Sequence, residues 1–185
     1  MAEIRTIGVI GAGALGREIA YASVLGGYRT VLEDILPASL RNAAAELREH
    51  LARAADVGSV SEAEANAAFS RLEYAATVEQ AAREADLVME AVPDEMESKI
   101  EIFTLLDKIC RPATILASNT FTLSVTEIAS VTYRAPKILG MRFANGSATK
   151  LLEIVRGRET SEQTLAACAD VARRLGREVV VMADR

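Results

Sequence analysis

The chain has 185 residues, 50% hydrophobic and 25% charged, a composition that excludes a disordered or fibrous chain and fits one globular domain over residues 1–185. The formal net charge of -5 supplies no basic field for nucleic acid, and Cys110 and Cys168 form no metal-binding pattern. Because we find no signal-like start and no apolar run of membrane-spanning length, we expect a cytoplasmic protein without membrane contact.

Short β-branched runs alternate with longer alanine-rich stretches of helical periodicity, which predicts a mostly parallel sheet with helices on both faces. The run 87–92 is apolar almost without alternation, as is typical of a strand covered on both faces. In chain order we expect strands at 7–10, 30–33, 71–74, 87–92, 114–117, 137–141, 151–156 and 178–182. We expect helices at 15–25, 37–55, 61–69, 78–84, 96–109, 124–130 and 161–175.

The segment 38–68 is long, rich in alanine and glutamate, and lies between the second and third predicted strands. Ser61 followed by Glu64 is a capping box, which predicts that a new helix begins there. Two interpretations stay open at this point. The segment is either a helical hairpin that stands off the sheet or a long crossover with a break near Gly58.

A glycine-rich turn follows the first predicted strand and opens the first predicted helix. Its sequence is Gly11-Ala12-Gly13-Ala14-Leu15-Gly16, and its place between a strand and a helix makes the GxGxxG spacing informative. Gly11 permits a tight turn, Gly13 lets the backbone approach a diphosphate, and Gly16 allows the helix to pack on the strand. The free N–H groups at the start of that helix attract the anion, so even an acidic protein can bind a dinucleotide here.

Asp34 ends the second predicted strand, close to the usual distance of about 20 residues after the glycines. A carboxylate there accepts hydrogen bonds from the adenosine ribose and repels a 2′-phosphate, which favours NAD over NADP as the cofactor. The alternative is a glycine turn in a flavodoxin-like or nucleotide-sugar fold. The strand, glycines, helix and acid together predict a Rossmann-type, doubly wound fold.

Four further segments resemble, in their order along the chain, the NAD-binding domain of the L-3-hydroxyacyl-CoA dehydrogenase family. They are Glu90-Ala91-Val92-Pro93-Asp94, Ser118-Asn119-Thr120, Gly140-Met141-Arg142-Phe143-Ala144-Asn145 and Lys150-Leu151-Leu152-Glu153-Ile154-Val155. The resemblance covers essentially the whole chain. It implies NAD-dependent oxidation of a 3-hydroxyacyl-CoA, or a related 3-hydroxy acid, in fatty acid metabolism.

The resemblance also implies roles for single residues. Asp34 would take the adenosine ribose, Lys99 would lie near the nicotinamide-side ribose, and Asp94 stands where the family usually has Glu. The implied cofactor-binding set is Gly11, Gly13, Ala14, Leu15, Gly16, Asp34, Ala91, Val92, Asp94, Lys99 and Asn119. The implied catalytic set is Glu153, Ser118, Asn145 and Arg142, in which Ser118 and Asn145 hold substrate and Glu153 matches the partner of a catalytic histidine.

That histidine is absent from this chain. The family pattern is Gly-x-His-Phe-x-Asn-Pro. This chain has Arg142 at the His position of that pattern and Gly146 at the Pro position. An arginine stays protonated, so it cannot accept the hydroxyl proton as a base, although it can contact a carbonyl or an anion. An ion pair between Arg142 and Glu153, in place of a contact with substrate, is an equally good interpretation. His50, the single histidine, lies in a polar helical run, and we expect it to be exposed.

Family members continue past Asp184 into a helical domain that completes the acyl-CoA site and forms the dimer. This chain stops where that linker begins, either as part of a longer parent or as a short gene product. We therefore expect a homodimer or a separate substrate-domain partner. Two functions follow: an oxidoreductase impaired by the loss of the histidine, or a non-catalytic NAD-binding module that regulates or assembles with a partner protein.

Overall fold

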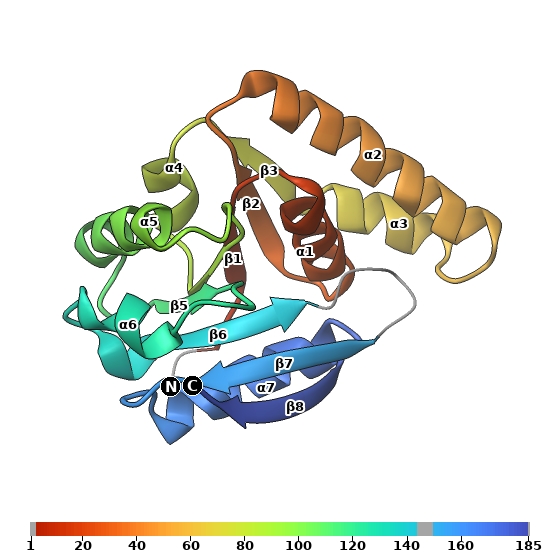
Figure 1. Ribbon diagram of the computed structural model, residues 1–185. Helices are drawn as coiled ribbons and strands as arrows, with labels where there is room; N and C mark the ends of the chain where they lie inside the picture. The colour runs from red at the N-terminus through yellow and green to blue at the C-terminus, as the bar shows by residue number, and fades with distance from the viewer. Residues whose placement is uncertain (1–2, 144–149, 185) are drawn as a thin grey trace.

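The sheet is the centre of the computed structural model, which describes residues 3–143 and 150–184 (Figure 1). Its eight strands follow the order β3-β2-β1-β4-β5-β6-β7-β8. They are β1 Thr6–Ile10, β2 Arg29–Glu33, β3 Leu72–Ala75, β4 Leu87–Glu90, β5 Ile115–Ser118, β6 Ile138–Phe143, β7 Leu151–Arg156 and β8 Glu178–Ala183. The first six are parallel, β7 runs antiparallel to β6, and β8 runs parallel to β7. The predicted mostly parallel, Rossmann-type sheet is confirmed.

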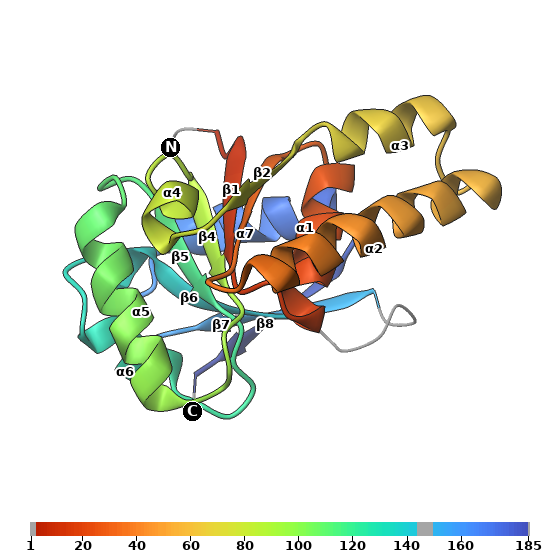
Figure 2. The same ribbon diagram turned by 90° about the horizontal axis from the view of Figure 1, so that it is seen from above.

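Helices cover both faces of this sheet, as expected (Figure 2). They are α1 Ala14–Leu25, α2 Pro37–Asp56, α3 Glu62–Phe69, α4 Val78–Ala82, α5 Met96–Ile109, α6 Val125–Ser130, the 3-10 helix η1 Ala135–Lys137, and α7 Glu162–Arg174. On one face Ile19 of α1 and Leu165 of α7 pack in the same apolar core. On the other face Phe103 of α5 and Ile128 of α6 pack in a second core. Two buried faces explain why the strand β4 is apolar up to its last residue, Glu90.

The segment between β2 and β3 is a helical hairpin, so the first of the two interpretations is confirmed. Helices α2 and α3 lie side by side and project away from the sheet (Figures 1 and 2). Gly58 turns the chain with a φ of 71°, and the Ser61–Glu64 capping box forms as predicted. A small apolar cluster of Val24, Leu51 and Ala68 joins the base of the hairpin to α1.

The connections place a crevice at the carboxyl ends of β1 and β4. From β1 the chain passes through α1 to β2 on one side, whereas β4 continues through α5 to β5 on the other side. In doubly wound sheets, ligands bind where the strand order reverses in this way. Among the residues that the structure describes, no helix combines the length and the apolar character needed to cross a bilayer.

Candidate active site

The glycine turn has the geometry that its sequence predicts. Gly11 has a φ of 97°, a left-handed conformation, and its N–H donates to the Glu33 carbonyl oxygen at 2.9 Å. A Cβ on Gly16 would lie 1.8 Å from the Gly11 carbonyl oxygen, so no side chain fits between helix and turn. A Cβ on Gly13 would meet nothing within 4 Å. Gly13 therefore keeps space open rather than allowing close packing.

A cavity of about 620 Å³ adjoins this turn at the start of α1. Gly11, Gly13, Ala14 and Leu15 line one wall. Gly13 is the N-cap of the twelve-residue helix and offers no side chain to the amide groups of its first turn. Those N–H groups have no acceptor within the helix, and together with the helix dipole they make an anion site.

Asp34 lies at the edge of the same cavity. Its carboxylate accepts hydrogen bonds from the Ala12 N–H at 2.9 Å and from the Leu36 N–H at 2.8 Å. These two bonds fix the carboxylate against the glycine turn and leave each oxygen a second lone pair for the hydroxyl groups of a sugar. Ala91 and Val92 also line this cavity, and their contact with a cofactor stays a prediction.

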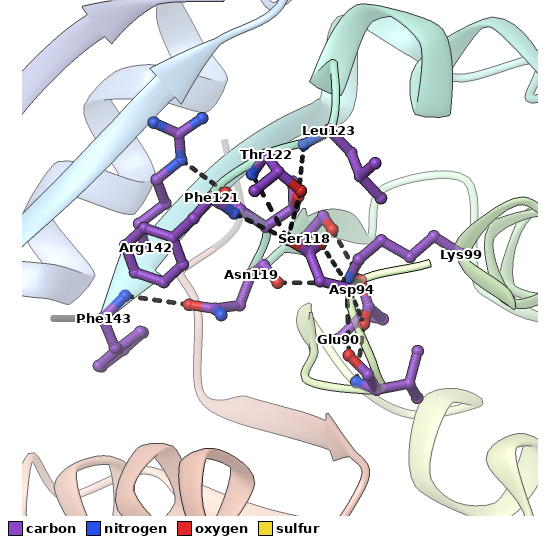
Figure 3. A network of polar contacts seen from close by, with 12 residues as sticks. Glu90, Asp94, Lys99, Ser118, Asn119, Phe121, Thr122, Leu123, Arg142 and Phe143 are labelled. Atoms are coloured by element: carbon purple, nitrogen blue, oxygen red, sulfur yellow. Dashed lines mark hydrogen bonds and ion pairs between the residues drawn. The ribbon is translucent and has the colours of Figure 1, made fainter. Parts of the chain in front are cut away.

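A buried ion pair joins Glu90 at the carboxyl end of β4 to Lys99 of α5 (Figure 3). The Lys99 Nζ lies 2.8 Å and 2.9 Å from the two oxygens of Glu90, and neither side chain is exposed (0%). The Ser118 Oγ donates to Glu90 Oε2 at 2.7 Å, and the Val92 N–H donates to Glu90 Oε1 at 2.8 Å. The Glu90 carboxylate thus has the cation and the hydrogen bonds that a buried charge requires.

This network changes the interpretation of two predicted site residues. Lys99 and Ser118 are both fully buried, and their polar atoms are used by Glu90. In this structure both polar groups are held by Glu90, and the expected cofactor contact of Lys99 and the expected substrate contact of Ser118 stay predictions. Glu90 was missed as a key residue. The available signal was a carboxylate that ends an otherwise apolar strand, which needs a buried cation close by.

Asn119 and Asp94 hold the loops around the site. Asn119 Oδ1 accepts the Phe143 N–H at 3.0 Å and so ties β5 to β6, while its carbonyl oxygen accepts Lys99 Nζ at 3.1 Å. Asp94 accepts the Thr122 hydroxyl at 2.9 Å, as well as the N–H groups of Phe121 and Thr122. Burial alone would raise the pKa of Asp94, but these hydrogen bonds outweigh burial and lower it. Both residues therefore position backbone segments at the mouth of the site.

Arg142 and Glu153 are direct partners across the antiparallel pair β6–β7. The Arg142 Nη1 lies 3.6 Å from Glu153 Oε2, which confirms the ion-pair interpretation. Arg142 Nε also donates to the Thr120 carbonyl oxygen at 2.5 Å (Figure 3). Only 9% of the Arg142 side chain is exposed, against 31% for Glu153. The half-exposed ring of Phe121 lies 5.9 Å from the guanidinium carbon. Among the described residues of this corner, the guanidinium of Arg142 can contact an anion or a carbonyl but cannot accept a proton.

The remaining candidates lie elsewhere. Asn145, predicted to hold substrate, falls outside the described residues. His50 is exposed on α2, as expected, and its ring meets that of Tyr21 edge-on at 5.8 Å. Cys110 and Cys168 are buried in the two cores, and burial raises their pKa values to about 11 and about 12, which keeps both thiols neutral.

The fold and the cleft together define a Rossmann-type dinucleotide-binding domain. The sequence profile of the family described as "3-hydroxyacyl-CoA dehydrogenase, NAD binding domain" matches residues 6–185. The chain therefore belongs to this family, and the expectation of NAD as the cofactor is confirmed at the level of the family.

Individual relatives agree with the family match. A probable 3-hydroxybutyryl-CoA dehydrogenase from Bacillus subtilis is 39% identical over 183 residues, which are 98% of this chain and 63% of that protein. A fatty acid oxidation complex subunit alpha from Idiomarina loihiensis is 33% identical over 98% of this chain and 25% of its own length. The crystal structure of (S)-3-hydroxybutyryl-CoA dehydrogenase from Ralstonia eutropha superposes with a TM-score of 0.94 at 32% identity, over 99% of this chain and 65% of that one. The chain thus spans less than two thirds of these relatives.

Proposed function

We propose that this chain is the cofactor-binding part of an oxidoreductase that transfers a hydride between NAD and a 3-hydroxyacyl thioester or a related 3-hydroxy acid, with catalysis impaired by Arg142. The observation that carries the proposal is the pairing of Arg142 with Glu153 at the end of β6, beside an intact glycine-turn cleft. Family membership supports the reaction class. The rest of the site would come from a substrate domain or from a second copy.

The cleft suits the shape and charge of NAD. The amides of Gly13, Ala14 and Leu15 would face the diphosphate, and Asp34 would accept the ribose hydroxyls. When bound, NAD supplies the hydride-transfer chemistry. Glu90 and Lys99 would hold the loops that border the cofactor, without touching it.

Arg142 explains the impairment. Oxidation of an alcohol requires a group that takes the hydroxyl proton, ideally one with a pKa near the working pH. The guanidinium stays protonated and is further fixed by Glu153 and the Thr120 carbonyl. It can orient a carbonyl or carboxylate of the substrate but cannot accept a proton. Loss of a general base costs about 10²–10⁴-fold in rate.

The decisive experiment restores the base. Arg142→His should raise the rate of NAD-dependent oxidation of 3-hydroxybutyryl-CoA by about 10²–10⁴-fold, with the helical domain of a relative supplied in trans. The assay follows NADH absorbance, and Arg53→His on the exposed face of α2 is the matched control, with no gain expected. No gain for Arg142→His, with NAD still bound, would show that position 142 does not face the reacting group.

The second candidate is a non-catalytic NAD-binding module that regulates or assembles with a partner protein. Two observations favour it. The Arg142 guanidinium already donates to the Thr120 carbonyl oxygen, and Val180, Val181 and Met182 of β8 are about half exposed. Such a module would bind NAD, form a homodimer or a mixed complex in sedimentation, and turn over no 3-hydroxyacyl thioester. Measurable oxidation by the unmodified chain would exclude it.

A further inference from the structure

Glu33 is a second carboxylate beside the cofactor cleft, and no motif identifies it in the sequence. It is the last residue of β2 and directly precedes Asp34. Only 5% of its surface is exposed, and that surface lines the same cavity as the glycine turn and Asp34. A carboxyl group so deeply buried is costly unless it is paired or neutral.

Glu33 is not paired. Among the residues that the structure describes, no cation forms an ion pair with its carboxylate and no side chain donates a hydrogen bond to it. The cavity that Glu33 lines is also lined by the apolar residues Ile10, Val78 and Val92, and Ala75 is the register partner of Glu33 on β3. The pKa of Glu33 responds to the charge of Asp34 and to a hydrogen bond from the Gly11 N–H. Among the described residues the carboxyl therefore has a backbone donor but no cation beside it.

The chemical state of Glu33 follows from these neighbours. Burial and the negative charge of Asp34 raise its pKa to about 7, against the opposing effect of the Gly11 N–H. The phosphates of a bound dinucleotide would add negative charge and favour the proton still more. A protonated carboxyl both donates and accepts a hydrogen bond, as the amide of Asn or Gln does when it pairs with an adenine edge.

We infer that Glu33 is a specificity-determining residue that reads the adenine edge of NAD in its protonated form. The inference rests on the proposed function, because it places the diphosphate at Gly13 and the ribose at Asp34. The lining of the cavity includes the apolar residues Ile35, Val78 and Val92, which would suit the faces of the base. Glu33 lines the same cavity, and its protonated carboxyl has the donor and the acceptor that would match the 6-amino group and a ring nitrogen.

Proton linkage makes the inference testable. A group that must be protonated in the complex binds its ligand less well as the pH rises above the pKa of the free protein. NAD affinity, measured by calorimetry on the full chain, should fall at least tenfold between pH 6 and pH 8.5. Glu33→Gln keeps the donor and the acceptor at every pH, so its affinity should stay flat and equal the low-pH affinity of the unmodified chain. Glu49→Gln on the exposed face of α2 should keep the full pH dependence.

A second variant separates hydrogen bonding from charge repulsion. Glu33→Leu removes both, and at pH 6 it should bind NAD about tenfold more weakly than Glu33→Gln. Equal or tighter binding by Glu33→Leu would overturn the inference, because it would leave only repulsion between Glu33 and the diphosphate. So would an unchanged pH dependence in Glu33→Gln. If no folded variant binds NAD at any pH, the proposed function itself fails.

Discussion

The two ends of the candidate site are built on different principles. At the β1–β2 end, binding depends on backbone geometry: a left-handed Gly11, an open Gly13 and the amides of α1, with Asp34 as the main side chain. At the β6–β7 end, the proposed chemistry depends on a side chain that can accept a proton, and Arg142 occupies that position. The first end has the glycine spacing and the acid that the family resemblance implies, whereas the second has Arg142 where the family pattern has His.

Under the proposed function, reactivity is lost at one end of the site while the fold and the cofactor cleft remain. Arg142 meets Glu153 across the strand pair, so the substitution leaves no buried charge without a partner. Nothing in the glycine turn depends on residue 142. A change of chemistry at one end therefore costs little stability, and the following experiments test how independent the two ends are.

The largest effect is expected at the ion pair that lies between the two ends. Glu90→Ala would leave the Lys99 cation buried without a partner, and should lower the free energy of unfolding by about 3–5 kcal/mol in urea titrations. Glu49→Ala, which removes an exposed pair with Arg53, is the matched control and should cost about 0.5 kcal/mol or less. An equal loss of unfolding free energy in the two variants would show that the buried Glu90–Lys99 pair stabilises the site no more than an exposed pair does.

Two glycine substitutions should separate folding from binding at the β1–β2 end. Gly16→Ala forces a Cβ against the Gly11 carbonyl and should lower the midpoint of thermal unfolding by several degrees. Gly13→Ala meets no neighbour, so its midpoint should stay unchanged while NAD affinity falls at least tenfold. Calorimetry checks the affinity. Normal NAD binding by Gly13→Ala would contradict the assignment of the open space to the diphosphate.

Asp34→Ala tests the ribose contact with a smaller effect. Hydrogen bonds to a charged group contribute about 1.5–3 kcal/mol, so NAD affinity should fall by about 10-fold or more. NADP affinity should fall less, because the repulsion of the 2′-phosphate disappears as well. The exposed Asp56→Ala is the control. An unchanged ratio of the two affinities in fluorescence titrations would remove Asp34 from the ribose.

The smallest effect is expected for Asp94, which links the two loops that border the site. Its folded pKa is lowered, so it adds stability above the ordinary carboxyl pKa of about 3.9, and that stability is lost as the pH falls through the folded value. Asp94→Asn should therefore unfold at a lower temperature than the unmodified chain at pH 7, and the difference should shrink as the pH falls below the ordinary carboxyl pKa. A difference that stays constant as the pH falls would have another cause.

Local patterns predicted most of the fold and the β1–β2 end. The glycine spacing, the alternation of strands and helices, and the Ser61–Glu64 box each act over a few residues, and the structure contains all three. Whether residues 38–68 fold back on themselves depends on packing against Val24, which no local pattern states. Strand 87–92 ends early at Glu90 because the Val92 N–H turns back to the Glu90 carboxylate.

The β6–β7 end and the buried network were harder to predict, because they depend on which way side chains point. Ser118 and Lys99 carry the right functional groups, but both point inward to Glu90. The burial of Glu33 beside the cavity was also hard to predict, since it depends on the apolar side chains that line the same cavity. Burial, and not residue type, decides each of these roles.

The burial of Lys99 also gives the site a built-in reporter of its own opening. Amine-reactive reagents need an accessible nitrogen, and the Nζ of Lys99 is fully buried while it is enclosed with Glu90. Lys108 and Lys150 are exposed and should acylate at once. The rate at which label accumulates on Lys99, read by peptide mass spectrometry, therefore measures how often β4, β5 and α5 part from one another, and any ligand that closes this corner should slow it.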